Sequence, residues 1–229
     1  MKILGIDTST RFLCVGVYDD GKISEYNLET GTLQAALLLP SIKRILEALK
    51  WQPEDLDYLA CGLGPGSFTG IRVGLSTVKG LAWALKKPIV GISTLDIIAN
   101  NAIGLDGKEV VTAVDAKREL IYCARFKLSG SGLKRTMPYK LIGIKELVKK
   151  ISPGSLIVGD ALNLYKGQII EAVKGARLLD KDHWYPKGRN IVALSKERIA
   201  QKKVTDTFGV KPVYLYPKEC QIKNAKRKT

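Results

Sequence analysis

A run of glycines at residues 62–74 restricts the possible fold of this chain more than any other stretch of its sequence. The run reads Gly-Leu-Gly-Pro-Gly-Ser-Phe-Thr-Gly-Ile-Arg-Val-Gly and leads directly into an apolar pattern with helical spacing. Glycine adopts backbone conformations that other residues avoid and proline fixes its own φ, so the loop has a demanding shape. It ends at a helix N-terminus, where unpaired N–H groups and the helix dipole favour negative charge. Two interpretations stay open: a loop that faces an anion, and a tight strand-to-helix connection with no ligand.

The spacing inside this segment differs from that of three common motifs. No Gly-Lys-Ser/Thr follows the glycines, which argues against a Walker-type nucleotide loop. The intervals between Gly64, Gly66 and Gly70 do not match the dinucleotide-binding pattern Gly-x-Gly-x-x-Gly. The residues around Ser67 do not form the Gly-x-Ser-x-Gly elbow that carries a nucleophilic serine. Any chemistry of this loop therefore follows another principle.

Composition indicates a globular protein without a membrane anchor. The 229 residues suffice for one large domain or two of ordinary size. No apolar run approaches the roughly 20 residues that cross a bilayer, and the early carboxylate Asp7 argues against a signal peptide. The cysteines are scattered without a Cys-x-x-Cys pair, which is typical of free thiols in a reducing cytoplasm. They are Cys14, Cys61, Cys123 and Cys220.

The positive charge is concentrated in the second half of the chain. Residues 1–100 contain 10 basic and 10 acidic side chains, whereas residues 101–229 contain 27 and 12, so the second half supplies the whole net charge of +15. Such asymmetry favours a polyanionic partner such as nucleic acid. Lysines that only keep the protein soluble explain the same count. The basic end at residues 223–228 is expected to be disordered without a partner.

Hydrophobic periodicity predicts the same order of elements twice, strand-strand-strand-helix-strand-helix. In the first half the strands are 2–8, 12–18, 22–28, 58–62 and 88–92, and the helices are 33–50 and 69–87. In the second half the strands are 109–115, 120–127, 133–141, 155–158 and 213–216, and the helices are 143–151, 161–173 and 190–203. Repeated topology predicts two related α/β domains that face each other, 1–100 and 101–229.

The two long helices of the first half have unusual surfaces. In the helix at 33–50 the apolar zone is wider than one stripe, and Pro40 either kinks this helix or marks its true start. The apolar stripe of this helix consists of Leu38, Ile42, Ile45 and Leu49. One face of the helix at 69–87 carries the small residues Gly70, Gly74, Thr77 and Ala84. These small residues allow either a partner helix to approach closely or tight packing within the domain.

Two aspartates occupy equivalent places in the two halves. Asp7 and Asp115 each end the first strand of their half, and a small residue follows each of them. Two carboxylates at facing strand ends could hold a magnesium ion bound to phosphates. Alternatively, each aspartate accepts backbone N–H bonds in its own turn. The first alternative would make the chain an ATP-dependent enzyme of the sugar-kinase type that uses Asp7 and Asp115 with magnesium.

Four segments together resemble the TsaB (YeaZ-type) family over nearly the whole chain: residues 6–10, 64–74, 114–118 and 211–215. The resemblance implies two related α/β domains of the actin/Hsp70/sugar-kinase (ASKHA) type. It also implies a role in making N6-threonylcarbamoyladenosine (t6A) in tRNA, at the adenosine next to the anticodon. A TsaB-like chain is expected to be a non-catalytic subunit that pairs with the catalytic subunit TsaD and is joined by TsaE. From the residues themselves, the basic second half is expected to lie near tRNA in the cytoplasmic assembly, and an exposed apolar helix face favours a homodimer when the chain is alone.

The resemblance also implies where these partners and ligands bind. TsaD is expected to contact the two long helices of the first domain, at Leu38, Ile42, Ile45, Gly70, Gly74, Thr77 and Leu81. A degenerate nucleotide or phosphate site is expected at Asp7, Thr8, Ser9, Asp115 and Gly159. ATP binding by the chain alone is expected to be weak or absent, because no second glycine stands beside Gly159. No cofactor and no metal site are expected, since the single histidine, His183, cannot form the histidine metal site of the catalytic relative.

Overall fold

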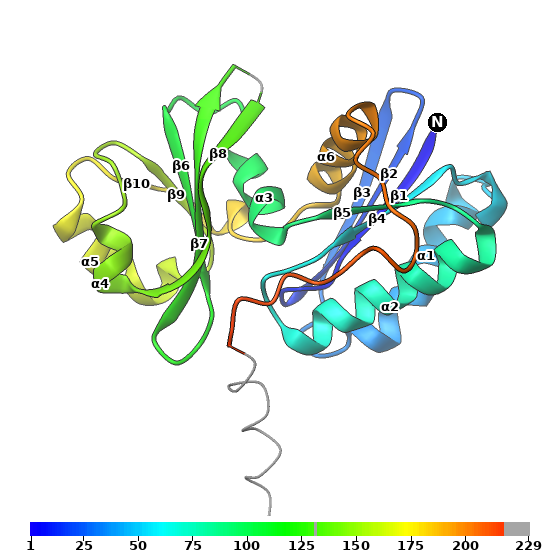
Figure 1. Ribbon diagram of the computed structural model, residues 1–229, viewed down its shortest axis with the longest axis horizontal. Helices are drawn as coiled ribbons and strands as arrows, with labels where there is room; N and C mark the ends of the chain where they lie inside the picture. The colour runs from blue at the N-terminus through cyan, green and yellow to red at the C-terminus, as the bar shows by residue number, and fades with distance from the viewer. Residues whose placement is uncertain (131, 218–229) are drawn as a thin grey trace, which may run out of the picture.

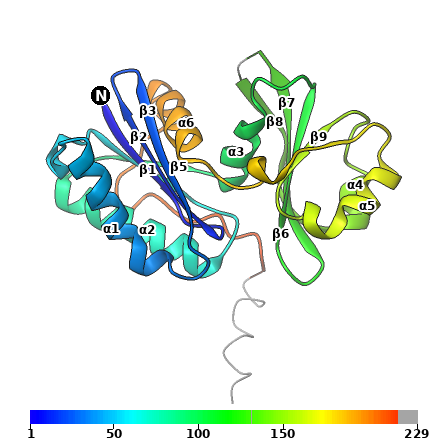
Figure 2. The ribbon, with the colours of Figure 1, turned by 180° about the vertical axis from the view of Figure 1, so that it is seen from behind.

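The computed structural model describes residues 1–130 and 132–217 and consists of two lobes (Figure 1). Each lobe is built on a five-stranded mixed sheet. Seen from behind, the two sheets stand side by side, with helices on their outer faces and further helices between them (Figure 2). We call the lobes N-terminal and C-terminal after the part of the chain that forms their sheets.

The N-terminal lobe follows the predicted order of elements. Its strands are β1 (Lys2–Asp7), β2 (Phe12–Asp19), β3 (Lys22–Glu29), β4 (Tyr58–Gly62) and β5 (Ile89–Ile92). Its outer helices are α1 (Gln34–Ala48) and α2 (Phe68–Leu85), with the 3-10 turn η1 (Pro53–Asp55) between them. Pro40 lies inside α1, so the alternative that it marks the start of the helix is wrong.

After β5 come the inner helix α3 (Thr94–Ala99) and the turn η2 (Asn100–Ala102), which lead into the second half of the chain. The strands of the C-terminal lobe are β6 (Glu109–Asp115), β7 (Leu120–Ser129), β8 (Gly132–Gly143), β9 (Leu156–Val158) and β10 (Arg177–Leu178). Its outer helices are α4 (Ile144–Val148) and α5 (Leu162–Ala172). The turn η3 (Lys181–His183) leads to the last helix, α6 (Gly188–Ala200).

Both sheets have one topology. The strand orders are β3-β2-β1-β4-β5 and β10-β9-β6-β7-β8, which are the same order when each half is numbered from its own first strand. In each sheet the first three strands form an antiparallel meander and the fourth pairs parallel with the first. Parallel pairing needs a crossover, and a helix supplies it in both lobes. The predicted repeat of one α/β topology is therefore confirmed.

Helix α6 belongs to the N-terminal lobe in space although it follows the C-terminal sheet in sequence. Its Ile191 and Val192 are fully buried in a cluster with Ile3, Cys14 and Val90 of the first sheet. The N-terminal sheet is thus covered on both faces, because α1 and α2 pack on its other face. We propose that the N-terminal domain consists of residues 1–100 together with α6, rather than of residues 1–100 alone.

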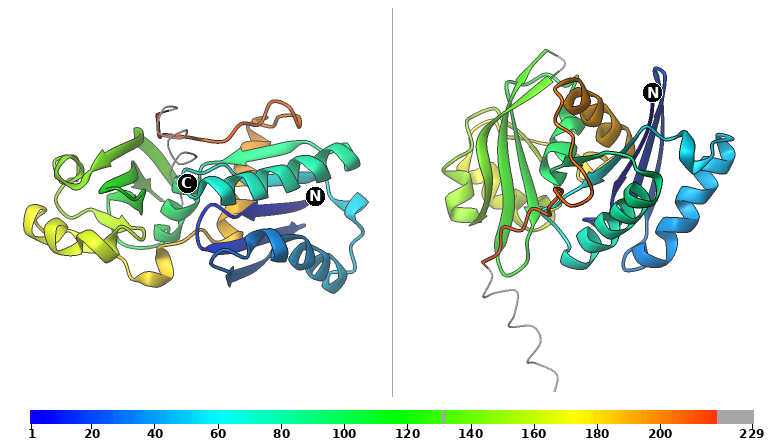
Figure 3. Two further views of the ribbon diagram at one scale, coloured as in Figure 1. Left: turned by 90° about the horizontal axis from the view of Figure 1, so that it is seen from below. Right: turned by 45° about the vertical axis from the view of Figure 1, so that its right-hand side comes forward.

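The segment after α6 also returns to the N-terminal lobe. Thr205 forms an isolated antiparallel bridge with Ile89, and Val210 is buried in the cluster beneath α1 and α2. Figure 3 shows this segment running along the N-terminal lobe toward the space between the lobes. The predicted strand at 213–216 is wrong: Val213 donates one backbone hydrogen bond to Leu63 without forming a strand ladder. The basic end at 223–228 and Cys220 lie outside the described residues.

Composition led to two expectations, one about membrane-spanning segments and one about free thiols. Among residues 1–130 and 132–217, no helix is both long and apolar enough to cross a membrane. The thiols of Cys14, Cys61 and Cys123 are free and buried. Burial raises the pKa of the Cys123 thiol to about 12, so this side chain behaves as a small apolar group.

The contact between β2 and α6 generates a stability prediction. A Cβ atom at Gly16 would overlap the backbone of Gly188, the first residue of α6, so Gly16→Ala must push α6 off the sheet. We expect a loss of about 3 kcal/mol in the free energy of unfolding. The control is Gly80→Ala at an exposed position of α2, where a Cβ would meet nothing within 4 Å. This variant should gain about 1 kcal/mol in the free energy of unfolding, because alanine favours the helix over glycine. Urea unfolding followed by circular dichroism measures both, and equal stabilities would contradict the assignment of α6.

Candidate functional site: the interlobe cleft and the outer helices

A cleft of about 560 Å³ lies between the two lobes. We call it the interlobe cleft. Its N-terminal wall is the turn after β1 together with the glycine loop, and its C-terminal wall is the turn after β6 together with the start of α5. The lining includes Ser9, Thr10, Gly66, Ser67, Asp115, Lys117, Tyr122, Asp160 and Tyr185. The structure therefore brings the ends of the two equivalent strands to one cleft.

Asp7 does not face this cleft. Its side chain is fully buried and accepts hydrogen bonds from the backbone N–H of Ser9 (2.7 Å), the Ser9 hydroxyl (2.6 Å) and the Thr94 hydroxyl (2.8 Å). Burial raises the pKa of this carboxyl, and the three donors oppose the rise. Asp7 thus ties the turn after β1 to the start of α3. The structure therefore matches the second interpretation, in which the aspartate accepts a backbone N–H bond in its own turn.

Asp115 lies in the cleft, but a neighbouring cation holds its carboxylate. One carboxylate oxygen accepts a hydrogen bond from the Lys117 ammonium at 2.6 Å. The other accepts a hydrogen bond from the backbone N–H of the same lysine at 2.8 Å. The backbone N–H of Asp115 donates to Asp160 at 2.9 Å, and burial raises the pKa of the Asp160 carboxyl. Among residues 1–130 and 132–217, no three histidine, cysteine or acidic side chains are placed to hold a metal ion.

The glycine loop packs against the turn after β1 more closely than any side chain would allow. A Cβ at Gly66 would overlap the carbonyl of Ser9, and one at Gly70 would overlap the carbonyl of Thr8. The Thr8 hydroxyl in turn donates to the Gly70 carbonyl at 2.6 Å, and Ser67 caps α2 by accepting the Gly70 N–H at 3.2 Å. The glycines are therefore explained by a tight strand-to-helix connection. Gly159 has a similar role, because it has a positive φ of 131° and its Cβ would overlap the backbone of Ala113.

The residues predicted to bind a partner divide into two groups. Four of them are buried in the chain's own core: Leu38, Ile42, Gly70 and Gly74. Ile45, Thr77 and Leu81 are partly exposed on α1 and α2. Because the Cβ of a residue at Gly74 would overlap the Thr8 hydroxyl, the glycine face of α2 packs inward. A role in partner binding stays a prediction for all seven.

The outward face of α2 carries a different set of small residues. Ser76, Gly80 and Ala84 are exposed, and Thr77 is partly exposed beside them. Ser76, Gly80 and Ala84 follow the spacing i, i+4, i+8 and therefore share one side of the helix. On α1, which lies next to α2, Leu39 is 56% exposed. Sequence analysis selected Ala84 but missed Gly80, although the spacing from Ser76 to Ala84 was readable.

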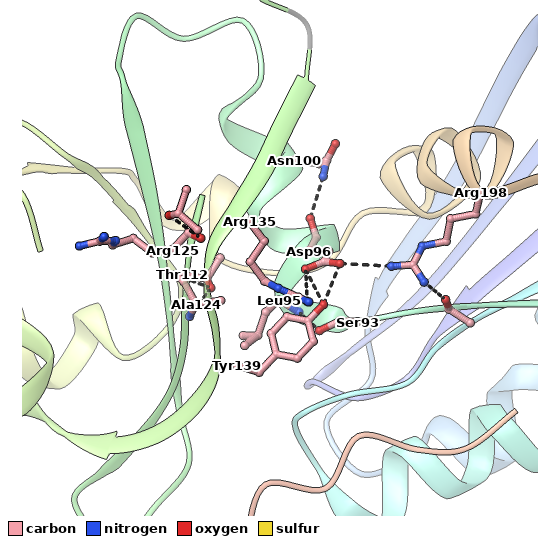
Figure 4. A network of polar contacts seen from close by, with 12 residues as sticks. Ser93, Leu95, Asp96, Asn100, Thr112, Ala124, Arg125, Arg135, Tyr139 and Arg198 are labelled. Atoms are coloured by element: carbon pink, nitrogen blue, oxygen red, sulfur yellow. Dashed lines mark hydrogen bonds and ion pairs between the residues drawn. The ribbon is translucent and has the colours of Figure 1, made fainter. Parts of the chain in front are cut away.

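A partly buried polar network joins the lobes, and sequence analysis missed it (Figure 4). Asp96 of α3 accepts the Tyr139 hydroxyl of β8 at 2.8 Å and approaches the Arg198 guanidinium of α6 at 3.4 Å. Arg135 of β8 stands 4.0 Å from the same carboxylate. Burial raises the pKa of Asp96, and it raises that of Tyr139 to about 12. The network connects the C-terminal sheet to both inner helices.

The paired sheets, the crossover helices and the cleft between equivalent strand ends define a fold of the actin/Hsp70/sugar-kinase class. YeaZ from Pseudomonas aeruginosa has this fold, with a TM-score of 0.82, 24% identity, and coverage of 93% of this chain and 99% of that one. The model of the family TsaD, described as tRNA N6-adenosine threonylcarbamoyltransferase, matches residues 33–185.

Two curated relatives extend the similarity to nearly the whole length. The tRNA threonylcarbamoyladenosine biosynthesis protein TsaB of Bacillus subtilis is 29% identical over 97% of each chain. TsaB of Buchnera aphidicola subsp. Schizaphis graminum is 32% identical, over 83% of this chain and 90% of its own. The chain belongs to the TsaD-like family and, within it, to the TsaB (YeaZ-type) proteins.

The burial of Asp7 generates a pH prediction. Because the pKa of Asp7 is raised in the folded protein, the unfolded chain releases this proton first as the pH rises. The wild type should therefore lose stability relative to Asp7→Asn as the pH rises above about 4, the ordinary pKa of an aspartate. Urea unfolding at increasing pH measures the difference, with the exposed Asp106→Asn as control. A difference that does not change with pH would show that Asp7 is not buried as described.

Proposed function

We propose that this chain is a non-catalytic subunit in the biosynthesis of t6A in tRNA, where it pairs with TsaD and makes it active. Membership of the TsaB family supports the pathway. The state of Asp7 is the observation that carries the non-catalytic role, because both of its oxygens are occupied by internal donors. The alternative of a sugar-kinase-like enzyme needs Asp7 and Asp115 to share a magnesium ion, and Asp7 is absent from the cleft lining.

The docking surface that we propose for TsaD is the outward face of α1 and α2. The two helices lie next to each other on the outside of the N-terminal lobe (Figure 1). Leu39 offers an exposed apolar side chain, while Gly80 and Ala84 leave room for a close approach. A helix of TsaD that packed there would approach closely over Gly80 and Ala84 and would bury apolar area, to which the exposed Trp83 beside them contributes. Ile45, Thr77 and Leu81 lie at the edge of this surface.

Further partners follow from the same role. We propose that TsaE joins the assembly, that the complex works on tRNA in the cytoplasm, and that the face of α1 and α2 pairs with a second copy of the chain when TsaD is absent. The charge of +15 favours the approach of tRNA to the complex.

Omission of the chain tests the proposed function. With the organism's own TsaD and TsaE, t6A formation on tRNA should fall to background when this chain is left out and return when it is added. Mass spectrometry of digested tRNA measures the modified nucleoside. Full t6A formation without the chain would refute the proposed function.

A glycine pair tests the docking surface. Gly80→Arg places a large charged side chain on the outward stripe, where a Cβ meets nothing within 4 Å, so the fold should tolerate it. We expect TsaD binding to weaken at least about tenfold, because the partner must desolvate or displace the arginine. The matched control is Gly167→Arg on α5, another exposed helical glycine with open space around it. Isothermal calorimetry with TsaD measures both affinities.

Equal TsaD affinities for these two variants would exclude this face as the docking surface. Gly74→Arg is unsuitable for the same test, because it would collide with Thr8 inside the lobe and report on folding instead.

A further inference from the structure

A second pocket, of about 330 Å³, opens beside the interlobe cleft. Four aromatic side chains from three separate segments line it, and we call it the aromatic pocket. They are Phe68, Tyr122, Tyr214 and Tyr216. The proposed pairing with TsaD through α1 and α2 makes no use of these rings.

The aromatic rings are held in place by contacts with one another and with the backbone. The rings of Phe68 and Tyr214 lie 5.2 Å apart between centroids and are tilted by 38°. Those of Tyr122 and Tyr216 meet edge to face at 6.0 Å, and the Tyr216 hydroxyl donates to the Ala116 carbonyl at 2.8 Å. The pocket is therefore a preformed set of aromatic faces and not a loose surface cluster.

Cationic side chains surround the same rings. The Arg72 guanidinium lies 3.7 Å from the centroid of the Phe68 ring, so it covers one face of this ring, and its Nε donates to the Tyr214 hydroxyl at 3.3 Å. Lys117 and Arg118 line the pocket from the β6–β7 turn. In this turn the three residues 117–119 have positive φ values of 63°, 53° and 60°, a conformation that L-residues disfavour. The turn thus places two basic side chains in the lining of the aromatic pocket, and one of them, Lys117, is paired with the Asp115 carboxylate at 2.6 Å.

We propose that the aromatic pocket binds an unstacked base of single-stranded RNA, with Arg118 next to an adjoining phosphate and the Lys117–Asp115 pair beside it. Aromatic faces accept any base, and neighbouring cations neutralise the backbone. The inference rests on the proposed function, since a t6A complex must receive the unpaired nucleotides of an anticodon loop. The charge distribution favours this occupant over an apolar peptide, because the basic half of the chain supplies both cationic residues of the pocket lining.

An aromatic pair of variants tests the stacking. Phe68→Leu keeps an apolar side chain but removes the aromatic face, and Trp83→Leu makes the same kind of change at a 71% exposed site on α2 that does not line the pocket. The probe is a fluorescein-labelled RNA hairpin with an unpaired loop, measured by anisotropy with the full chain. Phe68→Leu should weaken hairpin binding about tenfold, and Trp83→Leu should leave it unchanged. Binding of a fully paired RNA duplex should be the same for all three proteins.

A charge pair tests the phosphate contact. Arg118→Ala should reduce the slope of log affinity against log salt concentration by about 1, as expected for one lost phosphate contact. Lys166→Ala on α5 removes an exposed cation away from the pocket and should leave the slope unchanged.

Three results would overturn the inference. The wild-type chain fails to bind the hairpin; Phe68→Leu binds it as tightly as the wild type does; or Phe68→Leu loses TsaD binding while its RNA affinity is kept, which would make the occupant a protein segment. If t6A formation still requires the chain in any of these cases, the pocket assignment is wrong and the proposed function stands. If t6A formation proceeds without the chain, the proposed function fails whatever the RNA affinities are.

Discussion

The contact between the turn after β1 and the glycine loop is the constraint on which the rest of the structure depends. Gly62, Gly66, Gly70 and Gly74 each lie where a Cβ would overlap an atom of residues 7–9. This contact sets the position at which α2 begins, and α1 packs beside α2 over the same core. It also encloses Asp7 completely. One packing arrangement therefore builds the proposed docking helices and removes a carboxylate from the cleft where a kinase would need it.

The two lobes are joined by more than the chain between them. Helix α6 returns from the C-terminal sheet to cover the N-terminal one, at a point where Gly16 and Gly188 leave no space between their backbones. Asp96 adds hydrogen-bonded contacts to Tyr139 and Arg198 on different elements. Buried polar groups with several partners are costly to separate, because each would lose its donors or acceptors together. These contacts suit a subunit that presents a fixed surface.

Most of the fold was readable from the sequence, because strands and helices leave local periodic signals. Helix α2 shows the limit of such signals. Helical spacing correctly places Gly70 and Gly74 on one face, but it cannot show that Thr8 of the same chain packs against that face. The residues at 213–216 have the composition of a strand, yet β5 already meets Thr205 through an isolated bridge at its outer edge. The position of α6 and the Asp96 network depend on contacts between distant segments, for which a single sequence carries no signal.

Helix α2 contributes to both proposed binding surfaces, the aromatic pocket and the docking face for TsaD. Its first turns carry Phe68 and Arg72, which belong to the aromatic pocket and its cations, and its last turns carry Gly80 and Ala84 of the docking stripe. Its 18 residues span about 27 Å. A protein docked along this helix would therefore lie within one helix length of an RNA base held in the pocket. The glycine loop fixes the N-terminus of α2 against β1, so the same contact that buries Asp7 also sets the distance between the two partners.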